Sequence, residues 1–157
     1  MSLQEESNAV LKTLYNGYIQ SPGSIFEVGS IIKDTKIDPF ELCKYLEKQG
    51  FLKNVQNSGG KNVYASITIS GINKIDPDFV EDLKSKIISV LGMLGGRHRV
   101  MEVLSLEPKD FQLAFDIVKY LESLGLLKDS QYQHNNIVIE LSIEGLDYYE
   151  QNKASFL

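Results

Sequence analysis

The 157-residue sequence contains a single cysteine and no apolar run long enough to cross a membrane. One cysteine excludes a disulfide within the chain and fits a reducing compartment. The sequence also shows no leader that resembles a secretory signal. Together these absences lead us to expect a cytoplasmic protein that does not associate with membranes.

An excess of positive charge is also missing, since the formal net charge is −5. Residues 1–76 are neutral, whereas residues 77–157 carry six lysines and two arginines against thirteen acidic residues. Proteins that bind nucleic acid usually show a basic patch or stripe. Any such surface in this chain must therefore be local, because neither half as a whole is basic.

The sequence contains no pattern that indicates a catalytic or metal site. A Gly-rich phosphate loop with its lysine is absent, and the glycines of residues 92–96 lack dinucleotide-binding spacing. The two histidines, His98 and His134, lie far apart, without a carboxylate or cysteine at ligand spacing. Cys43 falls on the core face of its predicted helix, which favours a buried apolar role over redox sensing. We therefore expect a non-enzymatic protein without a cofactor or a metal.

What the sequence does contain is one stretch that occurs twice. Residues 40–54 read FELCKYLEKQGFLKN and residues 115–129 read FDIVKYLESLGLLKD, with eight identities in fifteen positions. Self-similarity at this spacing indicates two copies of one supersecondary unit. We expect two domains, at residues 1–75 and 76–157. Each is small for a self-sufficient core, so that mutual packing or a homodimer would add stability.

In the first half, the hydrophobic spacing predicts three helices followed by a β-hairpin. Ser24 and Glu27 form a capping-box pattern for the second helix, and Asp38-Pro39 is a typical start for the third. After Gly50 the period changes to two, which indicates strands. The expected helices cover residues 5–19, 24–32 and 38–49, and the hairpin strands cover 51–55 and 63–69, with a short helical turn to residue 75.

The second half repeats this order. Asp110 can cap the third helix, and the closing helix is expected to turn Leu146 and Tyr149 inward. The expected helices cover residues 78–94, 100–104, 110–124 and 144–151, and the hairpin tip covers residues 132–136.

Two pairs of sequence runs resemble known winged helix-turn-helix domains. YLEKQGFLKN followed by SITISGINKI, and YLESLGLLKD followed by LSIEGLDYY, are similar to the end of a recognition helix, a wing and a closing turn. Their LE…G.L and T..G patterns resemble those of MarR-like transcription regulators. The resemblance covers most of both halves. It implies a mainly α fold with small β-hairpins (α+β), made of two tandem winged-helix domains, each with three helices and a β-wing.

The function that this resemblance implies first is DNA binding in transcription regulation, with the third helix in the major groove. At 100° per residue, the outward side chains of the third helices include Lys44 and Lys48 in one copy and Asp116 and Lys119 in the other. No arginine lies on either helix, although arginine to guanine is the commonest specific contact. The two arginines of Arg97-His98-Arg99 come at the expected start of a helix. They can either clamp a phosphate there or simply make a turn soluble. The candidate nucleic-acid contacts are Lys44, Lys48, Lys53, Asn57, Lys61, Arg97, Arg99 and Lys119.

A protein-interaction module is the alternative. Tandem winged helices that resemble this layout serve as assembly subunits, among them the ScpB and MukE partners of bacterial condensins, a subunit of a membrane-sorting complex and RNA polymerase III accessory subunits. The acidic second half and the carboxylates that start each third helix favour this class. Aromatic side chains on the flanks of the outward face of the third helices can anchor a partner or pack within the fold. These are Phe40, Tyr45, Phe115 and Tyr120.

Overall fold

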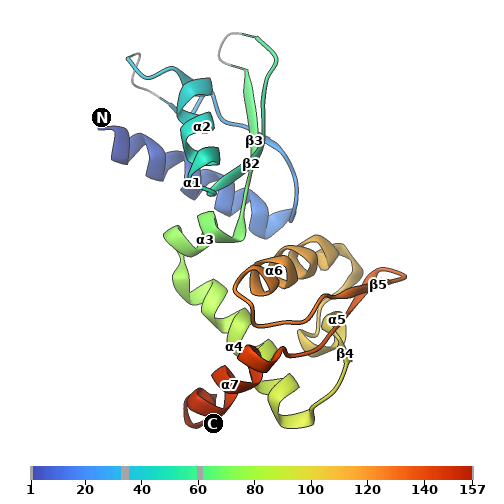
Figure 1. Cartoon of the computed structure of the whole chain (residues 1–157). Helices are drawn as coiled ribbons and strands as arrows, with labels where there is room; N and C mark the ends of the chain where they lie inside the picture. Colours follow the sequence, from blue (N-terminus) through green and yellow to red (C-terminus); the bar gives the residue numbers. More distant parts are fainter. Residues whose placement is uncertain (1, 33–35, 60–61, 157) are drawn as a thin grey trace. The chain divides into compact units, whose positions relative to one another are not determined.

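The structure is a computed structural model that describes residues 2–32, 36–59 and 62–156 (Figure 1). The chain divides into two compact units, Met1–Pro77 (unit 1) and Asp78–Leu157 (unit 2). Each unit combines α-helices with a small three-stranded antiparallel sheet, which confirms the expected mixture of helices and hairpins. No helix in the described ranges combines the length and the apolar composition needed to span a bilayer.

Unit 1 begins with α1 (Leu3–Gln20), whose first turn is fixed by a capping box between Ser2 and Glu5. The sheet has the strand order β1-β3-β2, so the return strand of the hairpin lies in the middle. Helix α1 packs against β3 and α3, and the apolar face of α2 lies on the hairpin. The remaining elements are β1 (Phe26–Glu27), α2 (Pro39–Lys48), β2 (Leu52–Asn57), β3 (Val63–Ile67) and α3 (Ile69–Ile75).

The prediction of a helix over residues 24–32 is wrong. Phe26 and Glu27 form the short strand β1, which pairs with β3. The Glu27 carboxylate, which we expected to cap a helix, accepts hydrogen bonds from the Gly29 N–H and the Ser30 hydroxyl at 2.7 and 3.0 Å. Pairing with a strand that lies far along the chain therefore overrides the helical spacing of the apolar residues in this segment.

Unit 2 repeats the sheet with the strand order β4-β6-β5. Its hairpin turns through only two residues, His134 and Asn135, which both have positive φ values of 36° and 60°. This is the backbone of a tight two-residue hairpin, so the expected tip over residues 132–136 is too long. The elements are α4 (Pro77–Leu94), β4 (His98–Arg99), α5 (Val100–Val103), a 3-10 turn (Pro108–Asp110), α6 (Phe111–Ser123), β5 (Gln131–Gln133), β6 (Asn136–Ile139), α7 (Ile143–Asn152) and a 3-10 turn (Lys153–Phe156).

The closing helix α7 orients its side chains only partly as expected. The Tyr149 ring packs on Gly92 of α4, so Tyr149 does turn inward. Leu146 does not, because 49% of its surface is exposed. The ring of Tyr149 also stacks on Phe156, with 6.0 Å between the ring centres.

In both units a single hydroxyl joins the root of the hairpin to the helix that follows it. The Thr68 hydroxyl donates to the Gly50 carbonyl at 2.6 Å and accepts from the Gly71 N–H at 3.0 Å. It therefore caps α3 and at the same time satisfies a carbonyl at the end of α2. This double role accounts for the T..G pattern. The matching groups in unit 2 are the Ser142 hydroxyl, the Gly125 carbonyl at 2.6 Å and the Gly145 N–H at 2.9 Å.

Candidate interaction surface

The duplicated stretch forms α2 in unit 1 and α6 in unit 2, which we call the repeat helices. Asp38 caps α2 through its carboxylate, which accepts from the Glu41 N–H at 3.1 Å, and Pro39 occupies the first turn. Both repeat helices end before a glycine with positive φ, 84° at Gly50 and 79° at Gly125. The backbone of the two helices therefore ends in the same way, and their outer faces can be compared directly.

On the outer face of α2, Lys44 contacts both Phe40 and Glu47, and all three residues are identical in the repeat. The Lys44 ammonium lies 5.9 Å from the centre of the Phe40 ring and 2.8 Å from the Glu47 carboxylate. The other oxygen of Glu47 accepts from the Val55 N–H of β2 at 3.3 Å. Glu47 thus links the exposed lysine to the hairpin.

The same arrangement recurs in unit 2. The Lys119 ammonium lies 5.9 Å from the centre of the Phe115 ring and 3.6 Å from the Glu122 carboxylate. Glu122 accepts from the Ser130 hydroxyl at 2.6 Å, so this glutamate too is tied to the segment that leads into the hairpin. Tyr132 adds a second ring, which stacks on Phe115 with 5.6 Å between the ring centres. We call Phe40–Lys44–Glu47 and Phe115–Lys119–Glu122 the outer-face triads.

The electrostatics of the triads follow from these contacts. The hydrogen bond from Lys44 lowers the pKa of Glu47, desolvation partly opposes this, and the hydrogen bond from the Val55 N–H adds to the lowering. The pKa of Lys119 is raised, mainly by its hydrogen bond with the Tyr132 side chain, and the charge of Glu122 contributes. Each triad therefore holds one positive and one negative charge side by side, and its net charge is zero.

The predicted nucleic-acid residues of the first hairpin lie near one another in the chain but have different surroundings. Lys48 is exposed and forms no ion pair with any residue that the structure describes. Lys53 is half-buried in β2 and interacts with other groups. The Asn57 side chain accepts from the Gly59 N–H at 2.9 Å and so shapes the hairpin tip. Lys61 lies outside the described residues.

Arg97 and Arg99 come directly before a helix, as expected from the sequence. Helix α5 begins at Val100 with Arg99 at its N-cap position, but His98 and Arg99 also form the short strand β4. Arg97 forms an ion pair with Glu140 at 3.6 Å, and Lys128 reaches the same carboxylate at 3.1 Å. The hydrogen bond from Lys128 is the main reason why the pKa of Glu140 is lowered, and Arg97 contributes. A phosphate at this place would have to compete with a carboxylate.

Asp116 does not point outward, contrary to the expectation from helical spacing. Only 7% of its surface is exposed, and its carboxylate accepts from the Gln112 side chain at 2.9 Å. The cause is the start of α6 at Phe111, about one turn earlier than the start of α2 in the repeat. The extra turn covers Asp116, whereas the matching Glu41 lies in the first turn of α2 and is exposed.

The four aromatic candidates fall into two groups. Phe40 and Phe115 are half-buried under the lysines of their triads. Tyr45 is 45% exposed, and its hydroxyl accepts from the Gln49 side chain at 3.1 Å, whereas Tyr120 is half-buried.

Sequence reasoning overlooked Tyr132, which is 48% exposed and completes the ring pair with Phe115. It also missed the role of Glu47 and Glu122. Their identity in the repeat, three residues after an identical lysine, was the signal that could have revealed it.

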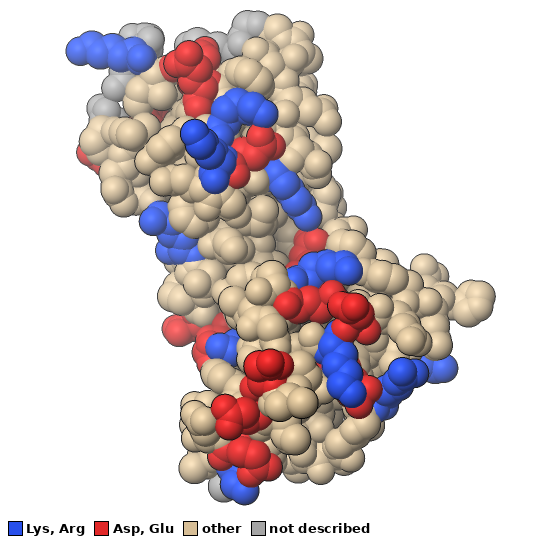
Figure 2. Space-filling view, in the orientation of Figure 1, with Lys and Arg blue, Asp and Glu red and all other residues tan. Residues whose placement is uncertain are grey.

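On the face drawn in Figure 2, acidic side chains lie among the basic ones in both units. Within the described ranges, no three histidine, cysteine, aspartate or glutamate side chains gather into a group that could hold a metal ion. His98 instead contacts the Gly95 carbonyl at 2.7 Å.

Comparison with known proteins identifies no relative. No family model matches the chain, and neither the curated proteins nor the solved structures give a match. Any function of the chain must therefore be inferred from the surfaces described above.

Proposed function

We propose that each unit is a winged helix and that the chain is a non-enzymatic protein-interaction module, in which the outer faces of the repeat helices contact a partner protein. The order of elements supports the first part. In each unit a repeat helix is followed by an antiparallel hairpin and a closing helix, and a short strand near the start of the unit pairs with the return strand. This order agrees with the resemblance of the sequence runs to wings and closing turns.

The outer-face triads are the observation that supports protein binding. A helix that reads the major groove uses arginine, lysine or amide side chains that are available to base edges and phosphates. In both units the lysine of the triad is held by a glutamate of its own helix. The remaining surface is aromatic and neutral overall, and such side chains are enriched at protein interfaces. Because the hairpin in unit 1, and the segment that leads into the hairpin in unit 2, fixes the glutamate, this surface is organised before any partner arrives.

DNA binding in transcription regulation remains the second candidate, because of the first hairpin. Its described residues from Lys53 to Asn62 include lysine and amide side chains and no acidic residue. Asn54 has a positive φ of 56°, next to a register shift in the β2–β3 pairing. A hairpin of this composition can contact phosphates or a minor groove without any contribution from the repeat helix.

Binding of a labelled random-sequence duplex at low and near-physiological salt separates these candidates. Phosphate contacts make affinity fall steeply with salt, because binding releases counterions from the DNA. We expect no salt-dependent binding by the wild-type chain. If the duplex does bind, and Lys53→Ala weakens binding and reduces the salt slope while Lys86→Ala does not, the DNA candidate replaces our proposal.

Photocrosslinking tests the protein-interaction candidate. A benzophenone amino acid replaces exposed Tyr45 or Tyr132, and the same probe at position 86, in place of Lys86, is the control. A protein that is crosslinked from Tyr45 or Tyr132 but not from position 86 is then purified and titrated against the untreated chain. We expect the combined substitution Lys44→Ala and Lys119→Ala to weaken that complex while both units stay folded. If the purified protein binds both chains equally, the triads are not the contact surface.

A further inference from the structure

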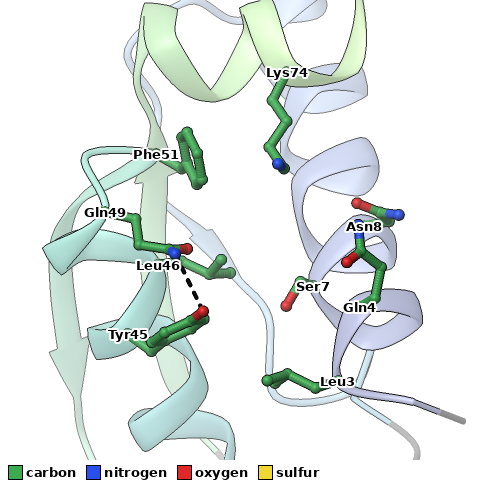
Figure 3. A pocket seen from close by; sticks show the side chains of 9 residues that line it. All are labelled: Leu3, Gln4, Ser7, Asn8, Tyr45, Leu46, Gln49, Phe51 and Lys74. Atoms are coloured by element: carbon green, nitrogen blue, oxygen red, sulfur yellow. Dashed lines mark hydrogen bonds between the residues drawn. The ribbon is translucent and has the colours of Figure 1, made fainter.

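Unit 1 contains a pocket of about 140 Å³ between the start of α1 and the end of α2 (Figure 3). Ser7 and Asn8 line it from α1, and Tyr45 lines it from α2. The Lys74 side chain extends from α3 into the space between these two helices. The pocket is therefore built by three helices, within one unit of the chain.

The pocket carries hydrogen-bond donors and no negative charge. None of the nine lining residues is acidic, and Lys74 supplies an ammonium group. The Tyr45 oxygen already accepts from the Gln49 side chain at 3.1 Å, so its own O–H is left to donate. Ser7 and Asn8 add a hydroxyl and an amide. This set of groups is complementary to a carboxylate.

An aromatic wall holds the lysine in place. The Lys74 ammonium lies 5.1 Å from the centre of the Phe51 ring. This cation–π contact restricts a long side chain that would otherwise be free to move, and it keeps the charge at the pocket. The same ring gives the pocket an apolar side on which the methylene groups of a ligand can lie.

Unit 2 shows that the fold does not require this pocket. The buried stripes of α1 and α4 have the same spacing, which places Lys84 of α4 where α1 has Ser7. The Lys84 ammonium lies 4.5 Å from the centre of the Tyr148 ring, and only 18% of its side chain is exposed. Tyr148 occupies the position in α7 that Lys74 occupies in α3. In unit 2 the long Lys84 side chain therefore covers the space next to this ring, whereas in unit 1 the small Ser7 side chain leaves the matching space open. The matched stripes are Val10, Leu11 and Leu14 in α1 and Ile87, Ile88 and Leu91 in α4.

The size of the pocket decides what it can hold. Pockets for drug-sized ligands or cofactors have volumes of roughly 300–1,000 Å³. A volume of about 140 Å³ is too small for such molecules and suits one side chain. From this size, the donors and the apolar wall, we infer that the pocket takes the glutamate side chain of an acidic segment in a partner protein. The inference rests on the proposed protein-interaction function and adds the chemistry of the partner.

A capped tripeptide, acetyl-Leu-Glu-Leu-amide, tests this inference by NMR titration of the ¹⁵N-labelled chain, with acetyl-Leu-Gln-Leu-amide as the matched peptide. We expect saturable shifts of the Gln49 and Asn8 side-chain amides with the glutamate peptide only. Lys74→Met keeps most of the side chain but removes the charge, and it should weaken binding roughly tenfold or more. Lys48→Met is the matched variant, because Lys48 is exposed in the same unit and does not line the pocket. It should bind the peptide as the wild type does.

Three results would overturn the inference: no shifts at the highest peptide concentration, equal shifts with both peptides, or equal weakening by Lys48→Met and Lys74→Met. Equal shifts with sodium acetate would show a site for any small carboxylate and would also contradict it. If a crosslinked partner binds the wild type and Lys74→Met equally, this inference is contradicted but the proposed protein-interaction function is not. If the chain binds the duplex in a salt-dependent way and Lys53→Ala weakens that binding, the proposed function itself is contradicted.

Discussion

The ring of Tyr149 in α7 lies directly on Gly92 in α4, so that no side chain separates the two helices at this point. A β-carbon on Gly92 would overlap ring atoms near the base of the tyrosine side chain, which cannot simply swing away. Gly92→Ala should therefore destabilise unit 2 by about 1–2 kcal/mol, because overpacking costs more than the improved helix propensity returns. Urea unfolding followed through the NMR signals of each unit measures the change and shows whether unit 1 is unaffected.

The effect of Gly92→Ala on the stability of unit 2 should change from destabilising to stabilising when the Tyr149 ring is absent. In a Tyr149→Ala background, Gly92→Ala removes a helical glycine without a clash and should stabilise unit 2 by about 0.5–1 kcal/mol. A double-mutant cycle tests this coupling. If Gly92→Ala is equally destabilising in both backgrounds, the contact with Tyr149 is not the cause.

Gly71 and Gly145 are required for a different reason. A β-carbon on either residue would meet a backbone carbonyl, that of Phe51 in unit 1 or Leu126 in unit 2. Backbone cannot move aside as the end of a side chain can, so Gly71→Ala should cost unit 1 about 1–3 kcal/mol, and Gly145→Ala should do the same to unit 2. Thermal unfolding measures both variants. Ser70→Ala is the control, and a loss of similar size there would remove the role that we assign to the close approach.

Cys43 should be unreactive in the native chain. Its surface is fully buried, and burial, followed by the charge of Glu47, raises the pKa of the thiol to about 12. A thiol reagent at mildly alkaline pH should modify the single cysteine only after unfolding. Rapid modification of the folded chain would show that α2 opens locally.

The same thiol predicts a loss of stability at alkaline pH. The folded pKa is about 12 and lies above the unfolded value, so the contribution is fully present below pH 9 and is lost as pH rises from 9 towards 12. Between pH 8 and pH 10, unit 1 of the wild type should lose about 1 kcal/mol more than that of Cys43→Ala. Urea unfolding at both pH values measures this difference, and parallel losses in the two chains would contradict it.

The stability that Glu47 contributes should be lost at acidic pH, in contrast to that of Cys43, which is lost at alkaline pH. The folded pKa of Glu47 is lowered, so its contribution is present above the unfolded pKa and is lost as pH falls through the folded pKa. Glu47→Gln should cost unit 1 about 0.5 kcal/mol near neutral pH and nothing once both states are protonated. Unfolding at neutral and strongly acidic pH measures the two costs. An equal cost at both would mean that the side chain acts through packing and not through its charge.

Much of the fold could be predicted, because the relevant signals are local. The period of 3.6 in α1 and α4, Asp38-Pro39 before α2 and the change of period after Gly50 each depend on a few neighbouring residues. The segment of residues 24–32 could not be predicted in this way. Its apolar spacing fits a helix, but β1 is defined by pairing with β3, and that pairing is visible only in three dimensions.

The candidate surface was only partly predictable for a similar reason. Helical spacing correctly placed Lys44 and Lys119 on the outside. Spacing does not show what a neighbouring element covers, so Asp116 was placed outside and Leu146 inside, and both placements are wrong. The partners that hold Glu47 and Glu122 lie eight residues further along the chain, beyond any helical repeat.

The hydroxyl that joins each hairpin root to its closing helix has a consequence for how the two halves can change over time. With the root fixed by Thr68 or Ser142, residues added or lost at the tip need not disturb the packing beneath. The tips differ between the units: two residues separate the paired strands in unit 2, and five residues separate Asn57 from Val63 in unit 1. After a duplication, each half could thus acquire its own recognition loop while the other kept its original one.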